Sequence, residues 1–386
     1  MRNDEAAAEE TAPSGARTVW VPFSFLAVWG YVLYGLGNAV PYLRADLQLT
    51  EFQAGLHSSA LAIGVLAAGI GVDSLVRRIG SRWLPDVAVA LLVTGLGLIV
   101  FAPGLPVSLT GALMLGLGGG TLGIDVNVRL GRAGGSETRR LLGQANALAM
   151  VAAAAAPLAM GLAASGLHAW RVALLLPMVA YLGLAAIRPR EPEVRSTVLA
   201  PTSTLPGSYW LAWLMLLLSV SIEFSFVYWG STVVGKRTGI SSAEATLLAS
   251  LFVAGMFVAR AAIGRGLGAG RASPRLLATG LCVAMVGATV VWVSTVPALS
   301  GIGLFIGGLG IAGLWPIGLS AALQTAPNAR LKAAARATLA SGGAALVAPS
   351  ALGLVADNVG VVGAWPIVLI LAACALLVLA VTSRVR

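Results

Sequence analysis

The nonapeptide "APLAMGLAA" at residues 156–164 recurs 192 residues later as "APSALGLVA" at residues 348–356, with six of nine positions identical. The same shift superposes residues of another apolar segment, namely Gly111, Gly116, Leu117 and Gly118, on Gly303, Gly308, Leu309 and Gly310. Because 192 is close to half of the 386 residues, the chain is expected to consist of two similar halves.

The composition is that of an integral membrane protein. Hydrophobic residues make up 58% of the chain, charged residues make up 10%, and the mean hydropathy is +0.89. In a typical soluble domain about a quarter of the residues are charged. A hydropathy scan predicts helices of the length that a bilayer requires. The twelve predicted spans are 18–40, 54–76, 83–102, 107–128, 143–165, 170–187, 209–233, 243–264, 275–295, 298–324, 333–356 and 362–383.

The domain organisation follows from this count. Residues 18–187 and 209–386 are expected to form two six-helix bundles, joined by a polar cytoplasmic linker at 188–208. Residues 1–17 hold four acids and no apolar core, which predicts a disordered cytoplasmic tail. Because each half has an even number of spans, both halves begin on the same side of the membrane. The sequence therefore predicts an all-α fold of parallel repeats related by an axis along the membrane normal.

Loops that are rich in basic residues alternate along the chain with loops that have few. If the N-terminus is cytoplasmic, the inner segments hold twenty basic residues and the outer segments hold four, which are Arg44, Arg171, Lys236 and Arg237. This distribution follows the positive-inside rule and places both termini in the cytoplasm. It also accounts for the net charge of +10 without a nucleic-acid partner.

Two loop motifs resemble those of the major facilitator superfamily. The segment "DSLVRRIGSRW" (73–83) is similar to its motif GxLxDRxGRR: Arg78, Gly80 and Arg82 match, whereas Asp73 replaces the Gly and Arg77 replaces the Asp. The segment "GMFVARAAIGRGL" (255–267) is similar to the equivalent region of the second half. The resemblance implies that superfamily's twelve-helix fold and a gating role for charges at the inner surface. These are Asp73, Arg77, Arg78, Arg82 and Arg260, of which Arg260 is expected to snorkel or to pair across the cytoplasmic loops.

Three further segments, "EFSFVYWGSTVV", "GLGGGTLGIDVNV" and "GLGIAGLWPIGLSAALQTAP", resemble the fucose-permease-like branch of bacterial transporters. This resemblance implies a monomeric, multi-pass protein of the bacterial inner membrane that moves a small solute with protons. Drug and proton antiporters remain an alternative, although "LTGALMLG" (109–116) has Ala112 and Leu115 where their motif has Arg and Gln. A non-transporting receptor of the same fold is a further alternative.

Glu223 lies near the middle of the predicted span 209–233. An ionised acid at that depth costs about 2.5–3.5 kcal/mol. Burial favours its neutral form and water favours its carboxylate, so Glu223 is a candidate to carry a proton as a cavity changes its access. The alternative is a permanently protonated side chain that is hydrogen-bonded between helices.

Asp125 and Asn127 lie near the inner end of the predicted span 107–128. Arg129 follows Asp125 by four residues, in the order that favours a helical ion pair, and Arg77 or Arg78 is a further candidate partner. A structural or gating pair is expected, with a proton site at Asp125 and a substrate contact at Asn127 as the alternative.

Other candidate substrate contacts are aromatic or amide side chains. Tyr31, Tyr34 and Asn38 are spaced to fall along one side of the first span. Trp229 is expected either to stack on a substrate ring or to anchor the helix at the membrane interface. Trp315 is a candidate gate beside Pro316, which alternatively only kinks the helix.

The sequence lacks the patterns that typify enzymes and cofactor sites. It has no GxxxxGK[ST], HExxH or CxxC motif, and both histidines, His57 and His168, fall near outer ends of the predicted spans. Cys282 and Cys374 lie in apolar runs, which predicts packing positions and no disulfide. We therefore expect neither a cofactor nor a metal, and no enzymatic activity.

Overall fold

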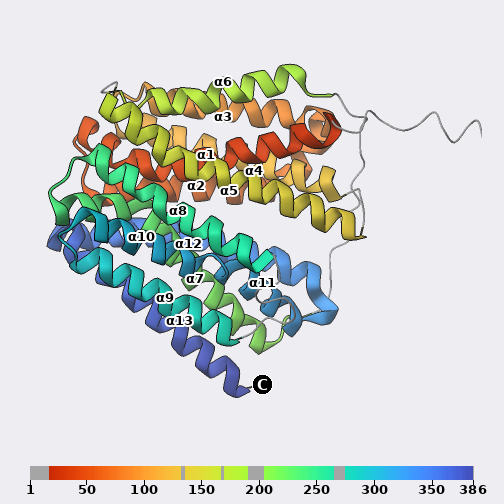
Figure 1. Cartoon of the computed structure of the whole chain (residues 1–386). Coiled ribbons are helices and arrows are strands. Elements are labelled where there is room, and N and C mark those ends of the chain that lie inside the picture. Colours follow the sequence, from red (N-terminus) through yellow and green to blue (C-terminus); the bar gives the residue numbers. More distant parts are fainter. Residues whose placement is uncertain (1–16, 132–134, 167–168, 190–203, 265–273, 386) are drawn as a thin grey trace, which may run out of the picture.

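The computed structural model describes residues 17–131, 135–166, 169–189, 204–264 and 274–385, and every element in these ranges is helical (Figure 1). The α-helices are α1 (Arg17–Leu47), α2 (Glu51–Ile79), α3 (Leu84–Val100), α4 (Leu105–Gly131), α5 (Gly135–Gly166), α6 (Val172–Ile187), α7 (Gly207–Thr238), α8 (Ser242–Gly264), α9 (Pro274–Val293), α10 (Pro297–Ile311), α11 (Leu314–Thr325), α12 (Arg330–Ala364) and α13 (Pro366–Val385). Short 3-10 turns, η1 (Ser81–Trp83) and η2 (Pro327–Ala329), precede α3 and α12.

The described helices make the twelve predicted spans. Ten stretches are long and apolar enough to cross a membrane, and α6 and α13 are shorter apolar helices. One of the ten, Pro297–Thr325, combines α10 and α11. The largest boundary difference is at α5, which begins at Gly135 and not at the predicted 143, whereas the loop predicted between 356 and 362 corresponds to a break in α12 at Gly360, whose φ is 74°. A positive φ costs glycine little, which explains why the break falls there.

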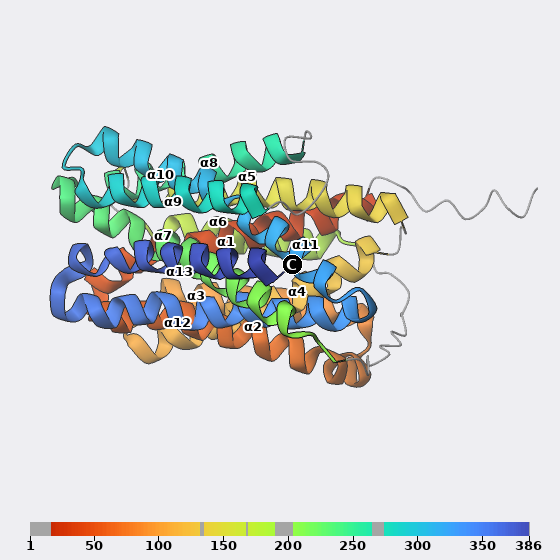
Figure 2. The same cartoon turned by 90° about the horizontal axis from the view of Figure 1, so that it is seen from below.

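Helices α1–α6 (the N-terminal bundle) pack together on one side of the molecule, and α7–α13 (the C-terminal bundle) pack on the other (Figure 1). Figure 2 shows where the bundles meet: α2 lies along α12, and α5 lies along α8. The predicted tail falls almost entirely outside the described residues, and most of the predicted linker does too.

The sequence repeat is also a repeat of packing. A Cβ atom on Gly116 of α4 would collide with the carbonyl oxygen of Leu61 on α2, and a Cβ atom on Gly308 of α10 would collide with that of Phe252 on α8. Helix pairs approach this closely only where the residue at the contact is small. Because the equivalent glycine makes the same contact in each bundle, the predicted pair of repeats is confirmed.

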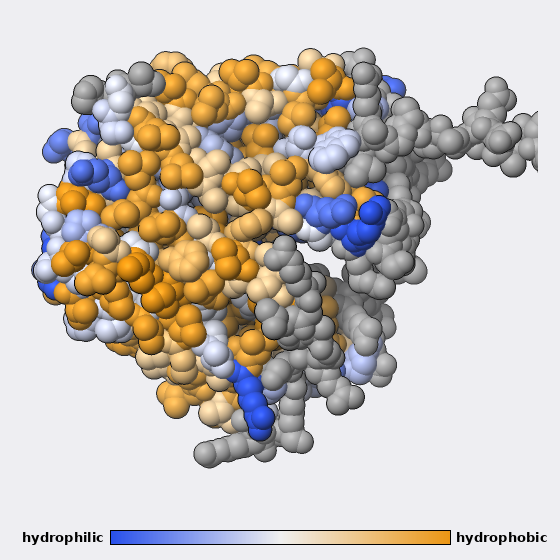
Figure 3. Space-filling model, viewed as in Figure 1, coloured by the Kyte–Doolittle hydropathy of each residue, from blue (hydrophilic) through white to orange (hydrophobic). Residues whose placement is uncertain are grey.

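Figure 3 shows a broad apolar surface over the middle of the molecule, with hydrophilic side chains gathered toward two opposite ends. At one end, which we call the closed end, the loops α1–α2, α7–α8 and α12–α13 come together (Figure 1). There, Tyr42 of α1 donates to Ser242 O (3.0 Å) and Thr246 Oγ1 (2.9 Å) of α8. At the opposite end, which we call the open end, the surface is hollowed between the bundles (Figure 3).

A proline inside α12 helps to join the bundles at the closed end. Pro349 of α12 has no N–H, so the carbonyl of Ala345, four residues earlier, lacks its helical donor. In a membrane such a carbonyl must find another partner within the protein. Ser58 of α2 provides it, donating to Ala345 O at 2.6 Å. The next residue, Ser59, donates to Leu346 O at 2.5 Å, so adjacent hydroxyls tie α2 to α12.

Candidate functional site

Tyr34 and Glu223 meet where the two bundles touch near the middle of the molecule. The Tyr34 hydroxyl of α1 donates to Glu223 Oε1 of α7 at 2.5 Å. Tyr34 is 6% exposed, and Glu223 is half-buried near the middle of α7. A short bond from a buried hydroxyl to an acid is strongest when the acid is ionised. The protonation of Glu223 therefore affects a bond that joins one bundle to the other.

Two further helices complete this site. The Tyr34 hydroxyl also lies 3.9 Å from Met256 Sδ of α8. Arg260 follows Met256 by one helical turn and thus shares its face of α8. The Arg260 guanidinium contacts Met150 Sδ of α5, again between bundles. We call Tyr34, Met150, Glu223, Met256 and Arg260 the central cluster, because they bring α1, α5, α7 and α8 together.

The position of Arg260 corrects the expectation of a partner in the cytoplasmic loops. Its Nε donates to Ala312 O at 3.1 Å, in the break between α10 and α11. Pro316 lies four residues after Ala312 and has no N–H to donate, so the carbonyl is free to accept from Arg260. The break thus supplies a polar partner for a charge that sits within the bundle. Trp315, next to Pro316, is half-buried and packs against an apolar cluster to which α7, α11 and α12 contribute.

The three candidate substrate contacts of α1, Tyr31, Tyr34 and Asn38, do not form a single binding surface. The Tyr31 hydroxyl donates to Ala173 O of α6 at 2.9 Å, a carbonyl left free by Pro177. Tyr31 therefore braces the N-terminal bundle, whereas Tyr34 reaches the C-terminal bundle. Asn38 is 3% exposed and donates to Tyr34 O at 2.9 Å. Among the described residues its Oδ1 has no hydrogen-bond donor, which leaves it available to a ligand.

Trp229 is not an interfacial anchor, which corrects one of its two expected roles. It is 1% exposed, and its indole Nε1 donates to Pro349 O of α12 at 3.0 Å. An interfacial anchor would present its ring to lipid headgroups. Trp229 instead fixes α7 to α12 close to the Ser58 contact.

The ion pair expected on α4 is present. Arg129 Nε donates to Asp125 Oδ2 at 2.6 Å, with only 12% and 8% of the two side chains exposed. A buried pair at this spacing constrains both side chains and is costly to break on one side only. Asn127 is exposed on the same helix.

Two of the four charges at and after the end of α2, Arg77 and Arg82, have local contacts. Arg77 donates to Ser74 Oγ at 2.8 Å within α2, and Arg78 is exposed. The Arg82 guanidinium lies over the Trp83 ring, 5.4 Å from its centroid. The side chain of Asp73 lies outside the described part of the chain.

Sequence reasoning missed a second ion pair at the same end of the molecule. Arg188, at the end of α6, is paired with Asp86 of α3 and also donates to Arg82 O at 3.2 Å. The two paired residues are 102 positions apart, so no helical spacing could have indicated the contact.

The contacts of the closed end were missed as well. Asp357 of α12 accepts the backbone N–H groups of Glu51 (2.6 Å) and Phe52 (3.1 Å) at the start of α2. Glu51 in turn pairs with Arg44 at 2.9 Å. For the Ser58 contact, a signal was available in Pro349 of the repeated nonapeptide, because a proline in a membrane helix frees a carbonyl that needs a donor from elsewhere.

Comparisons with known proteins agree on the architecture. Residues 23–305 match the model of the family described as Major Facilitator Superfamily. A search of curated proteins found no match. A bacterial homologue of the human lysosomal transporter Spinster, crystallised in an inward-facing and unoccupied conformation, has a TM-score of 0.74 and 12% identity, over 96% of this chain and 98% of that one.

Two further solved structures have similar values. The nucleoside transporter NupG has a TM-score of 0.73 and 14% identity, over 95% of this chain and 98% of that one. A POT family transporter in complex with a thioalcohol-conjugated peptide has a TM-score of 0.73 and 13% identity, over 95% of each chain. At such identities the likeness shows a shared fold, and it does not extend to a substrate.

Proposed function

Because the chain belongs to the Major Facilitator Superfamily, we propose that it is a secondary transporter that moves a small solute across the plasma membrane, driven by protons bound at Glu223. The observation that carries this proposal is the 2.5 Å hydrogen bond from Tyr34 to Glu223. It puts a titratable group of one bundle in direct contact with the other bundle. The narrower likeness to the fucose-permease-like branch stays a hypothesis about the substrate.

The bond gives protonation a mechanical consequence. When Glu223 is ionised, it accepts a charge-assisted hydrogen bond from Tyr34, and such bonds are about twice as strong as neutral ones. When Glu223 is protonated, the bond weakens and the bundles lose part of their attraction. A proton at Glu223 therefore shifts the balance between arrangements of the bundles, which is what coupling requires.

The contacts between bundles support alternating access. Between described residues, the hydrogen bonds from one bundle to the other lie at the closed end or at the central cluster, and the open end has a hollow between the bundles. With the termini in the cytoplasm, this arrangement is open to the inside. Rocking the bundles about the central cluster would break the closed-end contacts and expose Glu223 to the outside.

The groups around the cluster favour a neutral, partly apolar solute. Tyr34 and Asn38 supply a hydroxyl and a free amide oxygen, and Met150 and Met256 supply polarizable thioethers. Arg260 already donates to Ala312 O and contacts Met150. These groups suit a solute with a few hydroxyl or amide groups on an apolar frame.

The experiment needs a substrate first. Thermal-shift screening of a solute library on the purified protein would identify it, since a ligand at 100 times its Kd adds about 2.7 kcal/mol of stability. Uptake into proteoliposomes is then measured with and without an imposed pH gradient. We expect Glu223→Gln to bind the solute and to exchange it, but to lose accumulation driven by the gradient.

Glu244→Gln is the matched control. Glu244 is an exposed acid on α8, and among the described residues its hydrogen bonds are all to Ser241 at the start of its own helix. It should keep gradient-driven accumulation. Full accumulation by Glu223→Gln would contradict the proton role, and the sign of the gradient that drives movement distinguishes uptake from efflux. A wild-type protein that moves no identified ligand under any gradient would instead indicate a receptor.

A further inference from the structure

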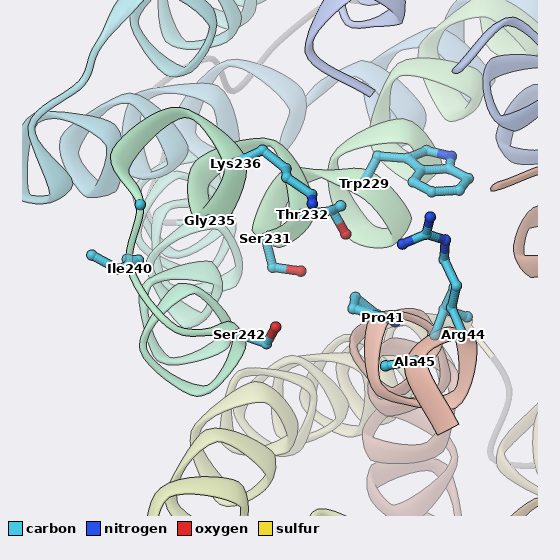
Figure 4. A pocket seen from close by; sticks show the side chains of 12 residues that line it. Pro41, Arg44, Ala45, Trp229, Ser231, Thr232, Gly235, Lys236, Ile240 and Ser242 are labelled. Atoms are coloured by element: carbon cyan, nitrogen blue, oxygen red, sulfur yellow. The ribbon is translucent and has the colours of Figure 1, made fainter. Parts of the chain in front are cut away.

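A pocket of about 330 Å³ opens at the closed end, between α1 of the N-terminal bundle and the α7–α8 hairpin of the C-terminal bundle (Figure 4). Its polar lining includes Arg44 from α1 and Ser231, Thr232 and Lys236 from α7. The volume suits a small organic molecule. None of the residues that line the pocket belongs to the central cluster, so the two are distinct sites.

The pocket is lined by two basic residues, Arg44 and Lys236, and by no acid, while Glu51, which pairs with Arg44 from beside the pocket, also attracts Lys236. The four basic residues assigned to the outer side by sequence are Arg44, Arg171, Lys236 and Arg237. Arg171 pairs with Asp46, Arg237 donates to Val293 O, and Arg44 pairs with Glu51. None of the ion pairs between described residues includes Lys236, which is exposed at the pocket.

Two buried polar atoms at this pocket lack partners. Within the described part of the chain, neither Ser231 Oγ nor Arg44 Nε has a hydrogen-bond partner. Ser231 is 3% exposed, and Figure 4 shows its hydroxyl directed into the space between α7 and α1. A buried polar atom without a partner costs about 1–3 kcal/mol. A ligand that accepts hydrogen bonds from both groups would remove that cost.

A purely structural explanation covers only part of this arrangement. Arg44 and Lys236 lie in the last turns of α1 and α7, where a positive charge favourably opposes the helix dipole. That effect explains the two charges. It does not explain why Ser231, next to the open volume, is buried without a partner.

We propose that this pocket binds a small organic oxyanion, such as a carboxylate or sulfonate on a compact apolar body, and that the bound anion holds the closed end shut. Arg44 and Lys236 attract the charge, Ser231 donates to it, and the apolar body fits against the non-polar lining. The non-polar lining includes Val40, Pro41, Ala45, Trp229 and Ile240. Because Arg44 and Lys236 belong to different bundles, parting the bundles at this end dismantles the site, so the anion favours the closed arrangement.

The test uses benzenesulfonate, which stays charged, and benzenesulfonamide as a neutral molecule of nearly the same shape. Binding to the purified full-length protein is measured by calorimetry at matched ionic strength. Opening of the closed end is followed by maleimide labelling of Ser59→Cys, a position 8% exposed between α2 and α12. This variant is made with both native cysteines, Cys282 and Cys374, replaced by alanine. We expect saturating benzenesulfonate to slow labelling at least tenfold and benzenesulfonamide to have no effect.

Lys236→Gln is the decisive variant, because Lys236 is exposed and its loss should not unfold the protein. It should weaken benzenesulfonate binding at least tenfold. Arg237→Gln is the matched control, since Arg237 neighbours Lys236 but bonds to Val293 O and does not line the pocket. Absence of benzenesulfonate binding, equal binding of benzenesulfonamide, or equal weakening by the two variants would each overturn the proposal. Binding without slower labelling would overturn its second part, and none of these results depends on proton coupling at Glu223.

Discussion

The carboxylate of Asp357 on α12 accepts the backbone N–H of Glu51 at 2.6 Å, the first residue of α2. The first N–H groups of a helix have no partner within the helix and carry a partial positive charge. An acid of the C-terminal bundle therefore caps a helix of the N-terminal bundle. This contact closes the same end of the molecule as the hydroxyl contacts of Ser58 and Ser59.

Removing the Asp357 carboxylate should loosen the closed end. A favourable charge at a helix N-terminus contributes about 0.3–2 kcal/mol, so Asp357→Ala should raise maleimide labelling of Ser59→Cys by roughly twofold to thirtyfold. Asn358→Ala is the control, because the side chain of Asn358 bonds, within the part of the chain that the structure describes, to Leu354 O on its own helix. Equal labelling of the two variants would show that the cap does not hold this end.

Ser58→Ala should destabilise the protein by about 1–3 kcal/mol, because Ala345 O would be left without a donor. The cost should fall when Pro349→Ala is also present, since an alanine N–H can then bond to Ala345 O within α12. Chemical unfolding of the two single variants and the double variant measures this coupling. An unchanged cost in the double variant would contradict the explanation based on Pro349.

Replacing either packing glycine of the repeat, Gly116 or Gly308, with alanine should destabilise the protein to a similar extent. Gly116→Ala and Gly308→Ala each place a methyl group against a backbone carbonyl of the neighbouring helix, and overpacking costs about 1–3 kcal/mol. Gly123→Ala on α4 is the control, because nothing lies within 4 Å of its added Cβ. That change should stabilise the helix by about 0.5–1 kcal/mol. Thermal unfolding of the three variants is the measurement, and a destabilised Gly123→Ala would contradict the assignment.

A disulfide across the closed end should stop transport. Ser59 Oγ and Ser350 Oγ lie 3.2 Å apart on α2 and α12, so Ser59→Cys with Ser350→Cys should cross-link on oxidation. Transport by the oxidised protein should be lost, and reduction should restore it. Each single cysteine variant serves as the control. Normal transport by the cross-linked protein would rule out opening at this end.

The orientation can be tested with two exposed positions. Thr204, just before α7, lies at the open end, and Lys236 lies at the closed end. In cells, a membrane-impermeant maleimide should label Lys236→Cys from outside and should reach Thr204→Cys only after the membrane is permeabilised. Labelling of both from the same side would contradict the twelve-span topology, and the reverse pattern would contradict cytoplasmic termini.

The sequence alone determined the features that can be read from the order of residues along the chain. Hydropathy over about twenty residues gives the twelve spans, because each span must satisfy its own backbone within the bilayer. The 192-residue shift gives the repeat, and the four-residue spacing gives the pair of Asp125 and Arg129. The spans and the ion pair need only the geometry of a single helix, and the repeat needs only a comparison of the sequence with itself.

The tertiary structure decided which helix faces which. Tyr31 and Tyr34 are three residues apart, yet the first bonds to α6 and the second to α7. Arg260 meets Ala312 O, and Asp357 meets Glu51 across 306 positions of the chain. Such contacts depend on how each helix is rotated and tilted against its neighbours. In a uniformly apolar helix the hydrophobic pattern does not fix that rotation; close packing at small residues and hydrogen bonds to proline-freed carbonyls do.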